Sequence, residues 1–287
     1  NSEVAISGFH TNVIRKRRNG QLLLQREEAA ERESPCDEKS LLSIEGALEF
    51  ADTVELDDVR ALVQRQIDYN YAIAQEGLRG NYGANIGSVL LKHDGDDVKV
   101  RAKAYAAAGS DARMNGCELP VVIVSGSGNQ GITASVPVVV YAKELGVSEE
   151  KMLRAVVLSD LITIHQKSGI GRLSAYCGAI SAGCGAGAGI AYLYGGGYEE
   201  IAHTVVNALA VVSGVVCDGA KASCAAKIAA AVDAGILGYW MYREGNQFFG
   251  GDGIVSKGVE NTIRNVGRLA REGMKETDKE IIKIMLE

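Results

Sequence analysis

The sequence contains little proline and few aromatic residues. Of its 287 residues only three are proline and 6% are Phe, Trp or Tyr, whereas 35 are glycine. So little proline argues against a long extended linker, and an apolar fraction of 47% provides for a buried core. Many glycines with few aromatics predict helices that pack closely through small side chains.

An excess of positive charge is also lacking. Lys and Arg number 30 against 36 Asp and Glu, a formal net charge of −6. The one concentrated basic run is Arg15 to Arg18, which we interpret as surface. Because nucleic-acid binding depends on a basic surface, we expect no nucleic-acid partner.

The six cysteines lack the short, regular spacing of a disulfide scaffold, and the printed sequence has no signal-peptide pattern. No CxxC pair is present, so neither a zinc ribbon nor a ferredoxin-type run is indicated. These features predict a reducing, cytoplasmic location.

One run is long enough to cross a membrane. Residues Leu173 to Tyr198 carry no charge. The run consists mostly of Ala, Gly and Ser and has no cluster of Lys and Arg on one side, which favours a helix in the centre of a bundle. We therefore expect no membrane partner.

The stretch from Arg172 to Ala226 is the most distinctive part of the chain, because it holds four of the six cysteines. They are Cys177, Cys184, Cys217 and Cys224. Seven residues separate the members of each pair, about two helical turns, so the sulfurs of a pair would point the same way on a continuous helix. Gly219 interrupts the second pair and predicts a turn at Cys217 with Cys224 in the first helical turns. Thiolates placed in this way can be metal ligands.

Two other interpretations of these cysteines stay open on spacing alone. Cysteine behaves as a small hydrophobe, so all four could belong to the core. A structural zinc site made by the four thiolates is the second alternative.

A glycine-rich loop follows the apolar run Val121–Val124. Glycines at positions 126, 128 and 131 would let the backbone approach a ligand, and a helix over about 132–145 would offer free N–H groups at its start. The polar residues of the loop favour a bound carboxylate or phosphate over tight packing alone. They are Ser125, Ser127, Asn129 and Gln130. No Rossmann or P-loop pattern is present, so nucleotide binding is weakly supported.

Local signals predict the remaining elements. Asn19-Gly20 predicts a hairpin between strands over 13–17 and 21–25. Further helices are expected over about 41–52, 56–75, 149–165, 259–271 and 277–285, and from residues 174, 198 and 221, with Ser148 as an N-cap. The pattern over 98–108 does not decide between strand and helix. The strand at Val4 opens in mid-pattern, which predicts a longer protein.

The fold expected from these elements is α+β and predominantly helical. We expect an α/β portion over residues 1–115 and a Gly/Ala-rich helical domain over 116–287.

Several segments resemble one family. They read IGRLSAYCGAISAG, VCDGAKASCAAKIA and DGIVSKGVENTIRNVGRLAREGM, and they resemble the L-cysteine desulfidase family, also called UPF0597, which shares the serine dehydratase alpha-subunit domain. The resemblance covers nearly all of the chain. It implies an enzyme that uses a [4Fe–4S] cluster instead of pyridoxal phosphate and converts L-cysteine to hydrogen sulfide, pyruvate and ammonia. Close relatives dehydrate L-serine.

The resemblance also implies site residues. It identifies Cys177, Cys217 and Cys224 as the cluster ligands, whereas Cys184 falls where the family pattern is looser. Family members begin with a region that bears a Gly-Cys-Thr-Glu-Pro motif, and nothing in this sequence matches it. We therefore expect the chain to correspond to the C-terminal two thirds of a family member.

Chemistry assigns roles to further residues. Three thiolates on a four-iron cube leave one iron open as a Lewis acid. The reaction also needs a base for the α-proton and donors for the α-carboxylate. The loop Ser125–Gly131 and Arg172 are the expected carboxylate-binding groups, and Lys221 or His10 is the expected base. Lys221 can act as a base only if burial lowers its pKa, and an ordinary ion pair is the alternative for Arg172 and Lys221.

Three functions therefore stay open. They are L-cysteine desulfidation, L-serine dehydration, and a non-enzymatic binding or redox-sensing role. We expect a small-molecule amino acid as the partner, and we allow for a homodimer.

Overall fold

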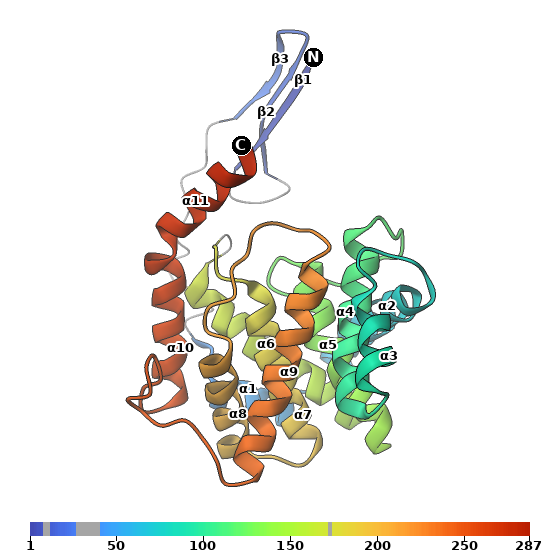
Figure 1. Cartoon of the computed structure of the whole chain (residues 1–287), viewed down its shortest axis with the longest axis vertical. Coiled ribbons are helices and arrows are strands. Elements are labelled where there is room, and N and C mark those ends of the chain that lie inside the picture. Colours follow the sequence, from blue (N-terminus) through green and yellow to red (C-terminus); the bar gives the residue numbers. More distant parts are fainter. Residues whose placement is uncertain (8–11, 27–40, 172–173) are drawn as a thin grey trace. The chain divides into compact units, whose positions relative to one another are not determined.

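The computed structural model describes residues 1–7, 12–26, 41–171 and 174–287 (Figure 1). Contacts divide the chain into one unit over Asn1–Leu41 and a second over Leu42–Glu287. The first contains a small antiparallel sheet and the second is helical. The predicted fold class, predominantly helical α+β, is confirmed.

The first unit is a three-stranded sheet in the order β1-β2-β3. The strands are β1 (Ser2–Ile6), β2 (Val13–Arg18) and β3 (Gln21–Gln25), and both pairings are antiparallel. Asn19 and Gly20 connect β2 to β3 with φ of 47° and 83°. Both values lie in the left-handed region that a two-residue hairpin turn requires, so the predicted hairpin is confirmed.

The second unit is built of helices. In chain order they are α1 (Ile44–Thr53), α2 (Leu56–Arg79), α3 (Ile86–Asp94), α4 (Val98–Met114), α5 (Gly128–Leu145), α6 (Glu149–Ile170), α7 (Gly178–Leu193), α8 (Tyr198–Val211), α9 (Cys224–Arg243), α10 (Val259–Arg268), a π-helical turn η2 (Leu269–Gly273) and α11 (Lys275–Leu286). Ser148 caps α6 as predicted, because its hydroxyl accepts from the backbone N–H of Lys151 at 3.2 Å.

The structure adds two elements that the sequence pattern did not settle. The undecided segment over 98–108 is helical and extends to Met114. Helix α3 was not predicted. Its N-terminus is held by the buried carboxylate of Asp111 on α4, which accepts from the backbone N–H groups of Ile86 at 2.7 Å and Ala84 at 3.4 Å. Such a long-range cap has no local sequence signal.

The boundary between the two contact-based units also differs from the expected domain boundary between residues 115 and 116. Helices α2 and α4 pack against α5, and α4 also packs against α9. These contacts join residues before 115 to the helical unit, so the separation by contacts falls at Leu41 instead.

Helix α7 is the central element of the helical unit, packed by α5, α6, α8 and α9 (Figure 1). A Cβ at Gly183 would lie 2.4 Å from the carbonyl oxygen of Ala231, and one at Gly187 would lie 2.6 Å from that of Gly235. From the first contact to the second, the residue number rises by four in both helices. Helices α7 and α9 therefore run parallel, with their backbones in contact. The expected close packing through small residues is therefore present at this interface.

The charge-free run expected to be an interior helix forms α7, which has 16 residues and is almost entirely buried. Among the described residues, α9 is the helix long and apolar enough to cross a membrane by length and composition. However, 56% of its apolar window is buried within the unit, as in the core helix of a soluble protein.

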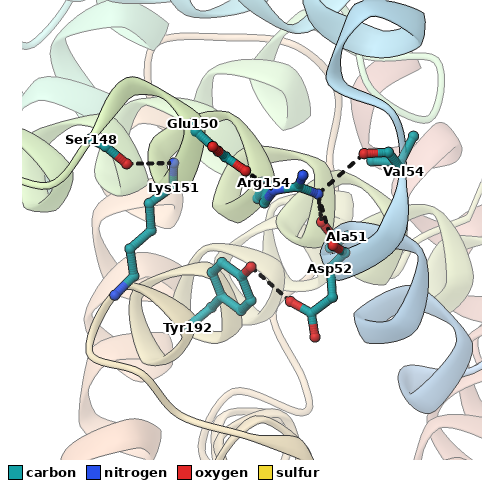
Figure 2. A network of polar contacts seen from close by, with 8 residues as sticks. All are labelled: Ala51, Asp52, Val54, Ser148, Glu150, Lys151, Arg154 and Tyr192. Carbon is teal, nitrogen blue, oxygen red and sulfur yellow. Dashed lines mark hydrogen bonds and ion pairs between the residues drawn. The ribbon is translucent and has the colours of Figure 1, made fainter.

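A polar network fixes α1 against α6 and α7 (Figure 2). Nη1 of Arg154 donates to the carbonyl oxygens of Ala51, Asp52 and Val54 at 2.7, 3.0 and 3.2 Å. These carbonyls end α1 and have no partner within the helix. The hydroxyl of Tyr192 on α7 donates to the Asp52 carboxylate at 2.8 Å. The end of α1 is thus held by side chains from two core helices.

The α7–α9 contact predicts a steric cost at position 187. We expect Gly187→Ala to lower the free energy of unfolding by about 1–3 kcal/mol, because its Cβ would overlap the backbone of Gly235. Urea unfolding would measure this. Gly214→Ala is the control, because no atom of the described residues lies within 4 Å of a Cβ there. Equal stability of the two variants would contradict backbone contact between α7 and α9.

Asp160 on α6 predicts a pH dependence of stability. Burial raises its pKa from 3.8 to about 7, although Gln66 donates to its Oδ1 at 2.9 Å. A raised pKa means that the folded state binds more protons than the unfolded chain between the two values. The free energy of unfolding should therefore fall as pH rises from about 4 to 7, by at most about 4 kcal/mol.

Asp160→Asn should remove this pH-dependent fall in the free energy of unfolding. We expect the variant to be less sensitive than wild type to a change from pH 5 to pH 8 in urea unfolding. Asp68→Asn is a matched control, because Asp68 also accepts from a glutamine, Gln64, but is exposed. An Asp160→Asn profile parallel to that of wild type would refute the assignment.

Candidate functional site

A short antiparallel pairing holds two of the cysteines together. Tyr176 pairs with Val216, the N–H of Cys177 donates to the carbonyl of Val215 at 3.1 Å, and the N–H of Cys217 donates to that of Ala175 at 2.6 Å. Side chains alternate between the faces of such a pairing, so Cys177 and Cys217 lie on one face and Tyr176 on the other. The pairing joins the residue before α7 to the segment before α9.

The two thiols interact directly. Cys177 donates to the sulfur of Cys217, which together with burial raises the pKa of Cys177 far above its ordinary value. The same interaction, with the N–H of Gly219, lowers the pKa of Cys217 to about 6. Of the two thiols, Cys217 is the one whose pKa is lowered, and the thiolate is the form of cysteine that binds metals.

Cys224 is the third cysteine that the family resemblance selects, and it lies at the start of α9. It is the first residue of α9, and its thiol lies 3.6 Å from the carbonyl oxygen of Gly219, the residue that turns the chain with φ of 96°. The predicted arrangement, with Cys217 in a turn and Cys224 at the start of a helix, is confirmed. Cys177 occupies the corresponding place in α7, where it is the N-cap residue.

Two lysines that sequence reasoning missed face these cysteines. Lys167 on α6 is 7% exposed and donates to the carbonyl of Gly171 at 2.8 Å. Burial lowers its pKa, and the negative charges of Cys217 and Cys177 partly offset that effect.

Lys227, one turn into α9, donates to the carbonyl of Val216 at 2.8 Å and pairs with Asp218. Burial alone would lower the pKa of Lys227, but Asp218 and the charges of Cys177 and Cys224 raise it.

Lys221, the expected base, lies on the outside of the same turn. Its ammonium pairs with Asp218, and 45% of its side chain is exposed. Asp218 has a pKa lowered to about 2 because Lys221 and Lys227 both donate to it. The burial on which a basic role for Lys221 depends is not present, and its contacts match the alternative of an ordinary ion pair.

The glycine-rich loop forms a tight turn at the start of α5. Val124 and Ser127 exchange two backbone hydrogen bonds across Ser125 and Gly126, whose φ values of 50° and 86° are left-handed. The segment before the turn is anchored by Asn70 on α2, which both donates to and accepts from the backbone of Val122. Helix α5 begins at Gly128, directly after the turn, so the loop presents its polar residues at a helix N-terminus.

Gln130 brings this loop to the cysteines. A Cβ at Gly178, the first residue of α7, would lie 2.6 Å from Nε2 of Gln130. Gln130 is 7% exposed, and its Oε1 has no hydrogen-bond partner among the residues that the structure describes. The start of α5 is therefore in contact with the start of α7, next to Cys177.

Arg113 reaches the same place from α4, although no sequence pattern selects it. A Cβ at Gly128 would lie 2.4 Å from its Nε, and its Nη1 donates to Oδ1 of Asn129 at 3.2 Å. Burial lowers the pKa of Arg113, and the charge of Cys224 opposes this effect. The guanidinium thus lies between the start of α5 and the start of α9.

The remaining predicted residues are placed as follows. Cys184 is fully buried in α7, and burial raises the pKa of its thiol to about 12, as expected for a core cysteine. His10 and Arg172 lie outside the described residues, and their expected roles stay predictions.

The donor set suits a cluster better than a single ion. Within the described ranges, no three His, Cys, Asp or Glu side chains are grouped so that they could hold one metal ion. The four-cysteine zinc alternative therefore has no support in this geometry. Cysteines that bind a four-iron cluster each attach to a different iron, so Cys177, Cys217 and Cys224 need not converge on one point. The lowered pKa of Cys217 and the ammonium groups of Lys167 and Lys227 fit such a group.

Comparison with known proteins identifies relatives along almost the whole chain. The family model described as serine dehydratase alpha chain matches residues 16–283. A UPF0597 protein of Desulfitobacterium hafniense (strain Y51) is 64% identical over 99% of this chain and 66% of its own length. A second, of Lachnoclostridium phytofermentans, is 56% identical over 99% of this chain and 68% of its own length.

A third UPF0597 protein, of Treponema denticola, is 46% identical over 96% of this chain and 66% of its own length. The chain thus spans about two thirds of the length of these relatives. No solved structure matches. The family match over residues 16–283 and these identities show that the chain belongs to the UPF0597 family, whose members carry the serine dehydratase alpha chain domain.

Proposed function

We propose that this chain carries the catalytic centre of a β-eliminating lyase that acts on L-cysteine. The observation that supports the proposal most is that Cys177 and Cys217 lie on one face of a short pairing, with the start of α5 against Gly178 and the cation of Lys167 buried nearby. The coarser class, a lyase-type enzyme family, follows from the family description. In this reaction L-cysteine loses its α-proton and its β-sulfur, and water releases ammonia from the remaining three-carbon unit to leave pyruvate.

Cys177, Cys217 and Cys224 would hold a [4Fe–4S] cluster. When bound, the cluster would supply a Lewis-acidic iron for the departing sulfur. Lys167 and Lys227 would balance the charge of the thiolates, since both already respond to it. Their contacts with backbone carbonyls would keep the ammonium groups in place.

The loop Ser125–Gly131 would bind the substrate. Its first helical amides have no partner within α5 and carry the positive end of the helix dipole, which favours a carboxylate. Ser125, Ser127 and Asn129 would add side-chain donors at the same turn. His10 and Arg172 keep their proposed roles as base and carboxylate ligand, whereas the exposure of Lys221 favours its ion-pair role.

L-serine is the second candidate substrate, because the matching family is described by serine dehydration. The two reactions differ only in the leaving group, sulfur against oxygen, so the same residues would serve both. A non-enzymatic binding protein is the alternative from another class, and it predicts neither iron nor pyruvate.

Anaerobic reconstitution tests the proposal. We expect about four irons and matching sulfide per chain in wild type, as a [4Fe–4S] cluster requires, and loss of iron in Cys217→Ala. Cys184→Ala is the matched control, because it removes a buried thiol of the same stretch without touching the three ligands. Iron retained in Cys217→Ala, or lost equally in both variants, would overturn the ligand set.

Product analysis then separates the substrates. Pyruvate and ammonia from L-cysteine, with hydrogen sulfide, support desulfidation, and pyruvate from L-serine alone would transfer the assignment to dehydration. Since the chain covers about two thirds of its relatives, the assay is run in parallel on the full-length protein of D. hafniense. Absence of iron and pyruvate from both proteins would leave the non-enzymatic alternative.

A further inference from the structure

An open pocket lies at the opposite end of α7 from the cysteines. It has a volume of about 360 Å³ and is lined by Leu48, Asp52, Lys151, Tyr192 and the turn Gly195–Gly197. Cys177 precedes α7 and Tyr192 lies in its last turn, so about 22 Å of helix separates the pocket from the cysteines. The pocket is therefore no part of the site described above.

Lys151 and Asp52 bring opposite charges to this pocket. Within the described ranges neither side chain forms an ion pair, and the ammonium of Lys151 has no hydrogen-bond partner. Oδ1 of Asp52 accepts from the hydroxyl of Tyr192 at 2.8 Å, whereas no donor of the described residues reaches Oδ2. Figure 2 shows the ring of Tyr192 between the ammonium and the carboxylate. Both charges are therefore available to a ligand.

Helix stability does not explain either charge. Lys151 is the third residue of α6, where the positive end of the helix dipole disfavours a cation. Asp52 lies in the last turn of α1, where the negative end disfavours an anion. Residues that oppose local stability without a compensating contact are expected at functional sites. The two charges therefore point to a binding role.

The glycine turn keeps the pocket open. Gly197 is the N-cap of α8 with φ of −93°, an angle that any residue adopts. A Cβ there would meet no atom of the described residues closer than Oε2 of Glu200 at 3.8 Å. Neither the backbone nor the packing therefore requires glycine at this position. A side chain would instead take up space at the pocket that Gly197 lines.

The size of the pocket and the placement of its charges suit an elongated zwitterion. At about 30 Å³ per molecule, 360 Å³ corresponds to about twelve waters. The two charges lie on either side of Tyr192, so a ligand that reaches both has to extend along the ring. The ammonium and carboxylate of an α-amino acid are attached to one carbon and do not extend so far. The ring and Leu48 offer apolar surface to the chain between two more distant charged groups.

We propose that this pocket binds a zwitterion whose ammonium and carboxylate are separated by about the length of a dipeptide. The carboxylate binds at Lys151 and the ammonium at Asp52. A dipeptide and an ω-amino acid share this chemistry. The inference goes beyond the proposed function, because it needs neither the cysteines nor a cluster.

Ligand-observed NMR titration of the whole chain at low ionic strength tests the proposal. The probe is 5-aminopentanoate. Pentanoate lacks its amine, pentylamine lacks its acid, and glycine has both charges on one carbon. We expect 5-aminopentanoate to bind most tightly of these four, and glycine to bind about fivefold more weakly or less tightly still. Glycylglycine places the same number of atoms between its charged groups, so the tighter of the two long zwitterions identifies peptides or ω-amino acids as the source.

Two variants remove one charge each. Lys151→Met should weaken 5-aminopentanoate and pentanoate by about fivefold and leave pentylamine unchanged. Asp52→Asn should weaken 5-aminopentanoate and pentylamine and leave pentanoate unchanged, while its amide oxygen still accepts from Tyr192. Lys92→Met and Asp68→Asn are the matched controls, because both residues are exposed on other helices. The melting temperatures should stay near wild type, because neither Lys151 nor Asp52 takes part in an ion pair within the described part of the chain.

The outcomes separate this inference from the proposed function. Selective loss of binding in the two variants supports the inference even if no iron or pyruvate is found. Three results would each overturn it: no binding of either long zwitterion to wild type, binding of glycine as tight as that of 5-aminopentanoate, or unchanged affinity in Lys151→Met. Failure of the cluster reconstitution would instead concern the cysteines, which the pocket does not include.

Discussion

The backbone contact between α7 and α9 is the constraint on which the site depends. Gly183 and Gly187 allow α7 to approach Ala231 and Gly235 more closely than any side chain would permit. Because the two helices run parallel in this contact, their N-termini meet at one end. Helix α5 joins them in the same direction, since Gln130 touches position 178 and Val138 lies near position 189. Three helix starts therefore surround the cysteines.

This arrangement has an electrostatic consequence. Each helix start adds partial positive charge, and Arg113, Lys167 and Lys227 add full charges, with the carboxylate of Asp218 beside Lys227. Positive surroundings favour the thiolate form of a cysteine whereas burial opposes it, and an anionic ligand is attracted to the same place. The pKa of Cys217 is lowered mainly by its interaction with Cys177, and the charge of Lys227 acts in the same direction. Packing of glycine against glycine thus produces the charge distribution that the proposed chemistry needs.

Local signals in the sequence were sufficient wherever structure depends on neighbours in the chain. Asn19-Gly20 predicted its hairpin and Ser148 its helix start, because turns and caps are decided within a few residues. The break at Gly219 likewise placed Cys217 in a turn and Cys224 in a helix. The resemblance of whole segments to a family added the choice of three cysteines over Cys184, which spacing alone left open.

The residues that sequence reasoning missed act across long chain separations. Arg113 looks like an ordinary basic residue in the last turn of a helix, and only its contact with Gly128 and Asn129 places it at the site. Helix α3 was missed because Asp111, 25 residues away from Ile86, caps it. Such roles depend on tertiary contacts that no local pattern encodes.

The contrast between Lys221 and Lys227 shows the same point within one segment. Both pair with Asp218, and the sequence favoured Lys221 because it belongs to the distinctive CDGAK run. The helix begins at Cys224, so Lys227 lies one turn inside it and on the side of the cysteines, whereas Lys221 stays in the turn before it. A shift of six residues therefore separates an exposed ion pair from a cation that responds to the charges of Cys177 and Cys224. The carboxylate of Asp218 serves both lysines and so holds the turn closed while Lys227 remains at the site.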